Sequence, residues 1–224
     1  MRLVEFSPKY HYNIINNKYN IMSISKYIKS GGKMKKIILA SKSPRRQSLL
    51  KNIGVEFTVI AHEIDEDSVS EKYPEETAQE LSYRKAMYIA KNMVNDCIVI
   101  GADTIVVCNG ILGKPADKEE AVNMLTRLQG NWHQVITGIS VVESLTMNCV
   151  KTYEKTFVKM RNLTQDTIKA YVNTGEPMDK AGAYGVQGFG SLLIEKIEGC
   201  YFNVVGLPIA KLGKIVEKFG ISFL

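Results

Sequence analysis

The sequence has few of the features by which membrane proteins and many enzymes are recognised. None of its apolar runs approaches the roughly 20 residues of a membrane-spanning helix, so we expect no membrane association. The 224 residues contain no GxxxxGK[ST], GxGxxG, HExxH or GxSxG motif. The three histidines have no metal-ligand spacing, which argues against zinc and serine-triad chemistry, and we interpret His133 as a half-buried strand residue.

Cysteine is scarce too, and its placement suggests no disulfide or metal framework. The four cysteines show no C-x-x-C spacing, and Cys97 and Cys108 flank apolar runs, where a reduced thiol acts as a small hydrophobic side chain. This usage fits a reducing compartment, and we expect a cytoplasmic protein. With 45% hydrophobic and 23% charged residues, the chain resembles an average globular protein that buries a real core.

The net charge of +6 is concentrated at one end of the chain. Residues 1–33 contain six bases and one acid, a net charge of +5, which leaves +1 for residues 34–224. A nearly neutral body argues against a stable nucleic-acid partner. Residues 1–33 also have a disordered composition and lack a secretory leader pattern. We therefore predict a basic, disordered N-terminal extension over residues 1–33 and an α/β domain over residues 34–224, with Met34 as a candidate start of translation.

Strand and helix patterns alternate from residue 34 onward. Strands are predicted over residues 37–40, 57–61, 97–107, 132–143, 148–159, 192–197 and 203–205. Helices are predicted over residues 44–53, 74–92, 118–128, 164–173 and 208–219, and Asp117 is an expected N-cap. Asn109-Gly110 predicts a tight hairpin turn. This order indicates an α/β fold with an elongated mixed β-sheet flanked by helices, in two lobes with the active cleft between them.

Residues 41–46, Ser-Lys-Ser-Pro-Arg-Arg, lie where a strand is followed by a helix. Ser43 is the expected N-cap and Pro44 the first helical residue. Two arginines in a first helical turn oppose the helix dipole by about 0.3 to 1 kcal/mol each, and a bound phosphate would reverse that penalty. The segment is therefore a candidate phosphate site. The alternative is that Arg45 and Arg46 are solvated or paired with surface carboxylates.

Asp103 interrupts the apolar run of residues 98–107. Burying a carboxylate costs on the order of several kcal/mol unless it is compensated, so we expect a cationic partner, for which Lys114 is a candidate. The alternative is a strand bulge in which Thr104 and backbone amides satisfy the carboxylate. Residues 63–67 are acidic, and taken alone they are better interpreted as a solvated face than as a metal site.

Residues 175–190 hold five of the 17 glycines of the chain, together with Lys180 and Gln187. Glycines allow the backbone to approach a ligand closely, and these two side chains supply hydrogen-bond donors. The alternative is an ordinary irregular loop between lobes.

Six segments in a fixed order make the sequence similar to a known family. SKSPRR (41–46), IDE (64–66), GADTIV (101–106), GKP (113–115), EPMDKAGAYGVQG (176–188) and NVVGLP (203–208) resemble the Maf-like nucleoside triphosphate pyrophosphatases. The likeness covers residues 35–224, and DKAGAYGVQG resembles the branch that acts on dTTP and UTP. Residues 1–33 fall outside the family pattern.

The resemblance implies a reaction and a set of site residues. Water would attack the α-phosphoryl group of a nucleoside triphosphate, giving the monophosphate and pyrophosphate. Asp103 would be the catalytic carboxylate, and Glu66 and Asp103 would hold a divalent cation, Mg²⁺ or Mn²⁺; which of the two takes the proton stays open. The implied substrate-binding residues are Ser41, Arg45, Arg46, Lys85, Lys114 and Gln187.

Two other functions are weighed against this one. The first is a regulator of cell division that binds nucleotides without hydrolysing them, and the joint presence of Asp103, Glu66, Lys85 and Lys114 favours the enzyme. The second is a nucleic-acid-binding protein, which the near-neutral body disfavours. A homodimer is left open, because the sequence does not determine the oligomeric state.

Overall fold

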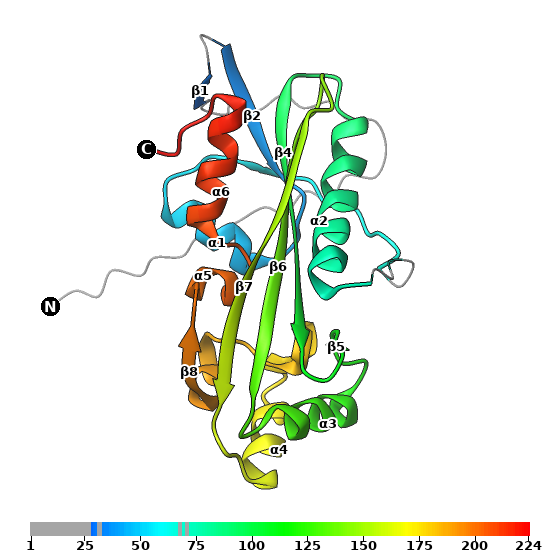
Figure 1. The fold of residues 1–224 in the computed structure, drawn as a ribbon, viewed down its shortest axis with the longest axis vertical. Helices are drawn as coiled ribbons and strands as arrows, with labels where there is room; N and C mark the ends of the chain where they lie inside the picture. The colour runs from blue at the N-terminus through cyan, green and yellow to red at the C-terminus, as the bar shows by residue number, and fades with distance from the viewer. Residues whose placement is uncertain (1–27, 31–32, 67–68, 70–71) are drawn as a thin grey trace, which may run out of the picture.

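The computed structural model describes residues 28–30, 33–66, 69 and 72–224 (Figure 1). Strand β1 (Ile28–Ser30) pairs antiparallel with β2 (Lys33–Leu39), so strand structure begins before residue 34. Residues 28–30 and Lys33 therefore differ from the expected disorder. The rest of that expectation falls on residues 1–27, 31 and 32, which lie outside the described residues.

Helices and strands interleave along the chain, as an α/β fold requires. After β1 and β2 come α1 (Pro44–Asn52), β3 (Thr58–Val59), α2 (Pro74–Lys91), β4 (Cys97–Val107), β5 (Ile111–Leu112), α3 (Lys118–Leu128), β6 (Trp132–Glu143), β7 (Cys149–Met160), α4 (Gln165–Asn173), the 3-10 helices η1 (Glu176–Asp179), η2 (Ala181–Ala183) and η3 (Gly188–Leu193), β8 (Ile194–Glu198), α5 (Tyr201–Val205), α6 (Ile209–Val216) and the 3-10 helix η4 (Glu217–Phe219). The predicted N-cap is confirmed, since Asp117 Oδ1 accepts from the Glu120 amide at 2.8 Å. None of the helices among these described residues has the length and hydropathy of a membrane span.

The strands form one mixed sheet in the order β1-β2-β4-β6-β7-β8, with β3 on β2 and β5 on β4. β2 runs parallel to β3 and β4, and the other pairs are antiparallel. The long strands β4, β6 and β7 extend through most of the molecule (Figure 1). The predicted elongated mixed sheet is thus confirmed.

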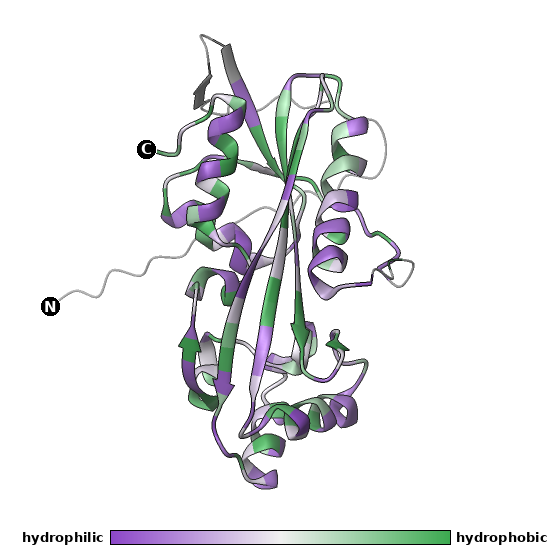
Figure 2. Cartoon of the chain, in the orientation of Figure 1, coloured by the Kyte–Doolittle hydropathy of each residue, from purple (hydrophilic) through white to green (hydrophobic). Residues whose placement is uncertain are grey.

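The helices cover the sheet in two lobes (Figure 1). In the first lobe α1 and α6 pack on one face through Leu50 and Leu212, and α2 packs on the other through Ala86 and Ala90. In the second lobe α3 and α4 enclose a separate core around Leu125. Figure 2 shows hydrophobic and hydrophilic residues on α2 and α6, as expected for helices with one buried side.

Helix α2 lies unusually close to the sheet because two glycines face it. A Cβ on Gly138 of β6 would lie 2.0 Å from the Ala78 carbonyl oxygen, and one on Gly101 of β4 would lie 2.2 Å from the Ser82 carbonyl oxygen. Both positions require a residue without a side chain. This close approach fixes α2, and with it the side chains that α2 presents at its end near the second lobe.

The sheet has an open edge in its middle, where β2 ends before β4 does. β2 pairs with β4 only as far as Leu39 and Ile100, and β5 joins β4 only at Val106 and Val107. Between these points β4 has a described strand partner on one side, β6. Open positions beyond the carboxyl end of a parallel strand are where α/β sheets commonly bind ligands.

Three sequence-based expectations are corrected. Residues 203–205 were expected in a strand but belong to α5, which ends at Gly206 with a φ of +119°. β8 begins at Ile194 because residues 188–193 form η3. His133 lies on β6 as predicted but is 2% exposed, so it is fully buried.

Candidate active site

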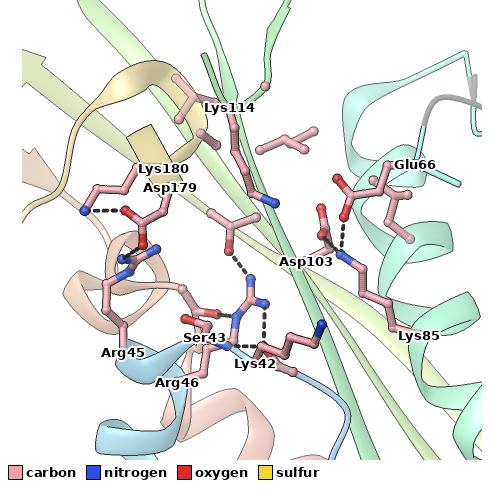
Figure 3. A pocket seen from close by; sticks show the side chains of 18 of the residues that line it. Lys42, Ser43, Arg45, Arg46, Glu66, Lys85, Asp103, Lys114, Asp179 and Lys180 are labelled. Carbon is pink, nitrogen blue, oxygen red and sulfur yellow. Dashed lines mark hydrogen bonds and ion pairs between the residues drawn. The ribbon is translucent and has the colours of Figure 1, made fainter. Parts of the chain in front are cut away.

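A cavity of about 960 Å³ opens at the exposed middle of β4, between the two lobes. Its walls come from the α1 N-terminus, the loop before α2, α2 itself, β4 and the glycine-rich segment after α4 (Figure 3). Every predicted site residue lines it: Ser41, Arg45, Arg46, Glu66, Lys85, Asp103, Lys114 and Gln187. Sequence segments about 150 residues apart therefore converge on one site, as the six motifs together suggested.

Asp103 meets its cationic partner from α2. Lys85 Nζ lies 2.5 Å from Asp103 Oδ1 and 2.7 Å from Glu66 Oε1, so one ammonium joins both carboxylates (Figure 3). The partner is Lys85, and Lys114 makes no such contact. The alternative of a bulge is wrong, because the pairing of β4 with β6 runs uninterrupted past Asp103 and Gly138.

The environment of Glu66 favours its ionised form. Burial alone would raise the pKa of Glu66, but the Lys85 hydrogen bond and the charges of Lys85, Lys114 and Arg46 hold it below its usual value. Glu66 is thus placed as a charged acceptor for cations at neutral pH.

Residues 41–46 turn from β2 into α1 as predicted, with Pro44 as the first helical residue. Ser43 occupies the N-cap position, but its side chain makes no capping hydrogen bond. Ser41 Oγ accepts from the Ser43 amide at 3.2 Å instead. The first amides of α1 therefore keep the capacity to bind an anion in the cavity.

Arg46 is held by three acceptors, none of them a carboxylate. Its Nε donates to the Gly206 carbonyl at 2.7 Å, Nη1 to Ser41 Oγ at 3.1 Å and Nη2 to Thr104 Oγ1 at 2.9 Å. Burial lowers the pKa of Arg46, and the charge of Asp103 partly offsets this. The guanidinium stays charged in any case. The alternative of a solvated side chain or a surface ion pair is therefore wrong for Arg46.

Arg45 does form an ion pair, and the pair links the lobes. Arg45 Nη1 lies 2.9 Å from Asp179 Oδ2, and Lys180 Nζ lies 2.6 Å from Asp179 Oδ1 (Figure 3). Burial alone would raise the pKa of Asp179, but Lys180 and Arg45 hold it below its usual value. The contact joins α1 of the first lobe to η1 of the second.

Lys114 and Gln187 line the cavity without a hydrogen bond or ion pair to other described residues. The Lys114 side chain extends toward Asp103 and Arg46 in Figure 3. Two donors thus face the cavity unused. Their position fits the substrate contacts that the resemblance implies for them.

Glu66 and Asp103 could hold a divalent cation only together with further oxygen ligands, such as substrate phosphates and water. Within the described ranges no three His, Cys, Asp or Glu side chains form a metal-binding group. Mg²⁺ in nucleotide sites, however, is commonly bound by one or two carboxylates with substrate phosphates and water. Glu66 and Asp103 beside the cluster of cations match that donor set.

Sequence reasoning missed two of the three neutral groups that hold Arg46, Thr104 and the Gly206 carbonyl. Thr104 follows Asp103 in the motif, and the alternation of side chains along β4 turns it toward α1 while Asp103 faces α2. The Gly206 carbonyl comes from the NVVGLP segment. That segment contributed to the family resemblance, but no site residue was predicted in it. Only the three-dimensional structure brings this carbonyl to Arg46, 160 residues away in sequence.

Comparisons with known proteins identify the family of this chain. The sequence model of a family described as Maf-like protein matches residues 36–219. The dTTP/UTP pyrophosphatase of Acetivibrio thermocellus is 50% identical over 197 residues, 85% of this chain and 98% of that protein. The dTTP/UTP pyrophosphatase of Thermoanaerobacter sp. is 52% identical over 184 residues, 82% and 96% of the two chains.

A solved nucleoside-triphosphatase / dITP/XTP pyrophosphatase from Mycobacterium abscessus aligns with a TM-score of 0.40 at 15% identity, over 82% of this chain and 94% of that one. That likeness is too distant to carry a functional argument. The match over residues 36–219 and the relatives at about half identity are decisive by themselves. This chain belongs to the Maf-like family.

Proposed function

We propose that this protein hydrolyses nucleoside triphosphates, with dTTP and UTP as substrates, to the nucleoside monophosphate and pyrophosphate. The observation that carries the proposal is the convergence of Arg45, Arg46, Lys85 and Lys114 on one cavity around the buried carboxylate of Asp103. The names of relatives about 50% identical support this choice of substrate.

The cations and helix amides bind the phosphates. Three of the five N–H groups of Arg46 are used within the protein, so two remain for phosphate oxygens. Lys114 adds a charge, and the α1 N-terminus adds amides and the helix dipole. Arg45 contributes by exchanging Asp179 for a phosphate. The positive charges and N–H donors would thus lie where negative charge develops on the phosphates in the transition state.

Asp103 acts on the attacking water. The water oxygen bonds to the α-phosphorus, and the bond from that phosphorus to the α-β bridging oxygen breaks. The bridging oxygen keeps the electron pair and leaves on pyrophosphate, while the proton of the water passes to the Asp103 carboxylate. Lys85 holds Asp103 and Glu66 in place. A divalent cation held by Glu66 and Asp103 would supply charge neutralisation for the phosphates.

The experiment is a product analysis with isotopic label. The purified protein is incubated with canonical and modified triphosphates and Mg²⁺ or Mn²⁺ in ¹⁸O-water, and the products are identified by chromatography and mass spectrometry. We expect monophosphate and pyrophosphate from dTTP and UTP, with the label in the monophosphate. Label in the pyrophosphate would place the attack on the β-phosphorus.

Other products would reject the proposal. Orthophosphate with a diphosphate would mean that a different bond is broken. Binding of dTTP or UTP without turnover would support the non-hydrolysing regulator instead. Turnover of other triphosphates alone would keep the reaction and reject the substrate choice.

The expected surroundings of the protein are part of the proposal. We expect it to act in the cytoplasm, without a stable nucleic-acid partner, and the near-neutral charge of residues 34–224 supports the latter. Light scattering after size-exclusion chromatography would decide whether it is a homodimer. Salt-dependent DNA binding would contradict the expectation on nucleic acid.

A further inference from the structure

Arg46 is the end of a chain of buried hydrogen bonds that runs away from the cavity. Its Nη2 contacts Thr104 Oγ1, which lies 2.9 Å from Thr137 Oγ1, and Thr137 Oγ1 lies 3.0 Å from the Asn203 carbonyl. Thr104 and Thr137 are directly opposite each other on β4 and β6. Thr137 is fully buried and is not part of the cavity wall.

Both ends of this chain fix its direction. The Asn203 carbonyl can only accept, so Thr137 donates its single hydroxyl proton to it. Thr137 must then accept from Thr104, which donates its own proton. Thr104 Oγ1 is therefore left as an acceptor for the Arg46 guanidinium, which can only donate. Each hydroxyl donates one hydrogen bond and accepts one, and the three bonds allow no other arrangement of protons.

The far end of the chain is anchored by Asn203, which is fully buried. Its Nδ2 donates to the Val135 carbonyl and to Thr156 Oγ1, each at 2.9 Å. Gly206 follows Asn203 by three residues in the sequence, and its carbonyl accepts a hydrogen bond from Arg46 Nε. A Cβ on Gly206 would lie 3.4 Å from Thr104 Oγ1 and 3.5 Å from Arg46 Nε. The NVVGLP segment thus holds Arg46 at two points, one direct and one through two hydroxyls.

We propose that Thr137 is a positioning residue for Arg46. Without touching the substrate, its hydroxyl fixes Thr104 as an acceptor and so orients the guanidinium whose remaining N–H groups bind phosphate. The inference rests on the proposed function, in which Arg46 is a phosphate ligand. It assigns to the buried hydroxyl on β6 a role in substrate affinity that neither its position outside the cavity nor its sequence context suggests.

The test compares Thr137→Val with Thr137→Ser. Valine keeps the shape and removes the donor, and serine keeps the hydroxyl. In Thr137→Val we expect KM for dTTP, and the Kd of inorganic tripolyphosphate measured by calorimetry in metal-free buffer, to rise about three- to tenfold, the effect of one hydrogen bond. We expect kcat to change far less, and Thr137→Ser to restore both values. If Thr137→Val does not fold, Thr137→Cys, with a weak donor of similar size, replaces it.

A matched control and a double-mutant cycle separate positioning from general damage. Ser140, also on β6 and fully buried, shares a hydrogen bond with Ser82 outside the cavity, so Ser140→Ala should leave the tripolyphosphate Kd unchanged. In an Arg46→Ala background, Thr137→Val should add no further loss, because its effect passes through Arg46. Additive losses, an unchanged Kd in Thr137→Val, or no rescue by serine would overturn the inference.

The two proposals fail separately in this design. If the wild-type protein hydrolyses no triphosphate while the tripolyphosphate cycle still shows coupling of Thr137 to Arg46, the proposed function fails and the positioning role stands. If triphosphates are hydrolysed and the cycle shows no coupling, the positioning role alone is rejected.

Discussion

At the residue scale, the decisive contact is the buried one between Asp103 and Lys85. The sequence already indicated that Asp103 needs a cation, because a carboxylate inside an apolar strand is costly. It could not indicate which one. Lys85 lies on α2, which precedes β4 in the sequence, and only the packing of α2 on β4 brings it to Asp103. Lys114, the candidate named from sequence, extends into the cavity instead.

Replacing Asp103 by asparagine should separate catalysis from folding. The variant keeps the shape of the side chain but cannot accept the proton of water, so we expect kcat to fall at least ~10²-fold. The fold should survive, because Lys85 keeps Glu66 as a partner at 2.7 Å. Activity is measured by pyrophosphate release and stability by thermal unfolding. An unfolded variant would make Asp103 a structural residue, and a fully active one would transfer the catalytic role to Glu66.

His133 should make stability depend on pH. It is buried on β6, with Nε2 2.6 Å from the Tyr184 hydroxyl, and burial lowers its pKa to about 4. The unfolded state binds a proton near pH 6.5. The free energy of unfolding should therefore fall as pH drops from about 6.5 to about 4, by up to about 3 kcal/mol from this group.

Urea unfolding at about pH 7.5 and about pH 4.5 measures this effect. The matched variant is His133→Gln, whose amide can still reach Tyr184 but does not titrate. Its loss of stability on acidification should be smaller than that of the wild type. Equal losses in the two proteins would show that His133 does not carry the acid sensitivity.

At the element scale, the helices and long strands were predictable, and the segments between them were not. The N-cap at Asp117 and the helix that follows it, α3, were expected from local signals, and both are confirmed. Residues 203–205 were assigned to a strand because Val204 and Val205 are β-branched. The structure places them in a short helix, since the buried Asn203 and the left-handed Gly206 fix the backbone there. The helical conformation of residues 203–205 is therefore set by tertiary contacts and not by local sequence.

The same limit applies to the site. Seven of the eight predicted site residues lie in the six motifs, and all eight, including Lys85 outside them, line the cavity. The chain Thr104–Thr137–Asn203 could not be predicted, because it depends on the register between β4 and β6. A shift of one residue would turn Thr137 to the other face of the sheet.

The close approach of α2 to β6 predicts a large effect of a small substitution. Gly138→Ala would place a methyl group against the Ala78 backbone, and backbone cannot move aside as a flexible side chain can. We expect a loss on the order of 1 to 3 kcal/mol or more in the free energy of unfolding. Gly213→Ala in α6 is the control, because nothing lies within 4 Å of the added carbon. It should stabilise by roughly 0.5 to 1 kcal/mol, and equal urea midpoints for both variants would contradict the argument.

At the scale of the whole molecule, a chain shortened to residues 34–224 should fold and keep its kcat/KM. The deletion removes β1, which pairs only with the start of β2, and none of the residues that line the cavity. Thermal unfolding and pyrophosphate release are the measurements. As a contrast, Lys35→Met keeps the full length but removes the partner of Glu143 and Asp96, and should lower the midpoint more. A large loss of turnover on deletion would show that residues 1–33 contribute to the site.

The continuity of β4, β6 and β7 through both lobes determines how the molecule can deform. Lobes joined by a flexible linker rotate about a hinge, but here any relative movement must bend or twist a ribbon of three strands held by continuous hydrogen bonds. A continuous ribbon of this kind resists bending, and the resistance grows with displacement. The cleft therefore returns to one resting width. The spacing between the cations of the first lobe and the donors of the second is therefore an elastic property of the sheet.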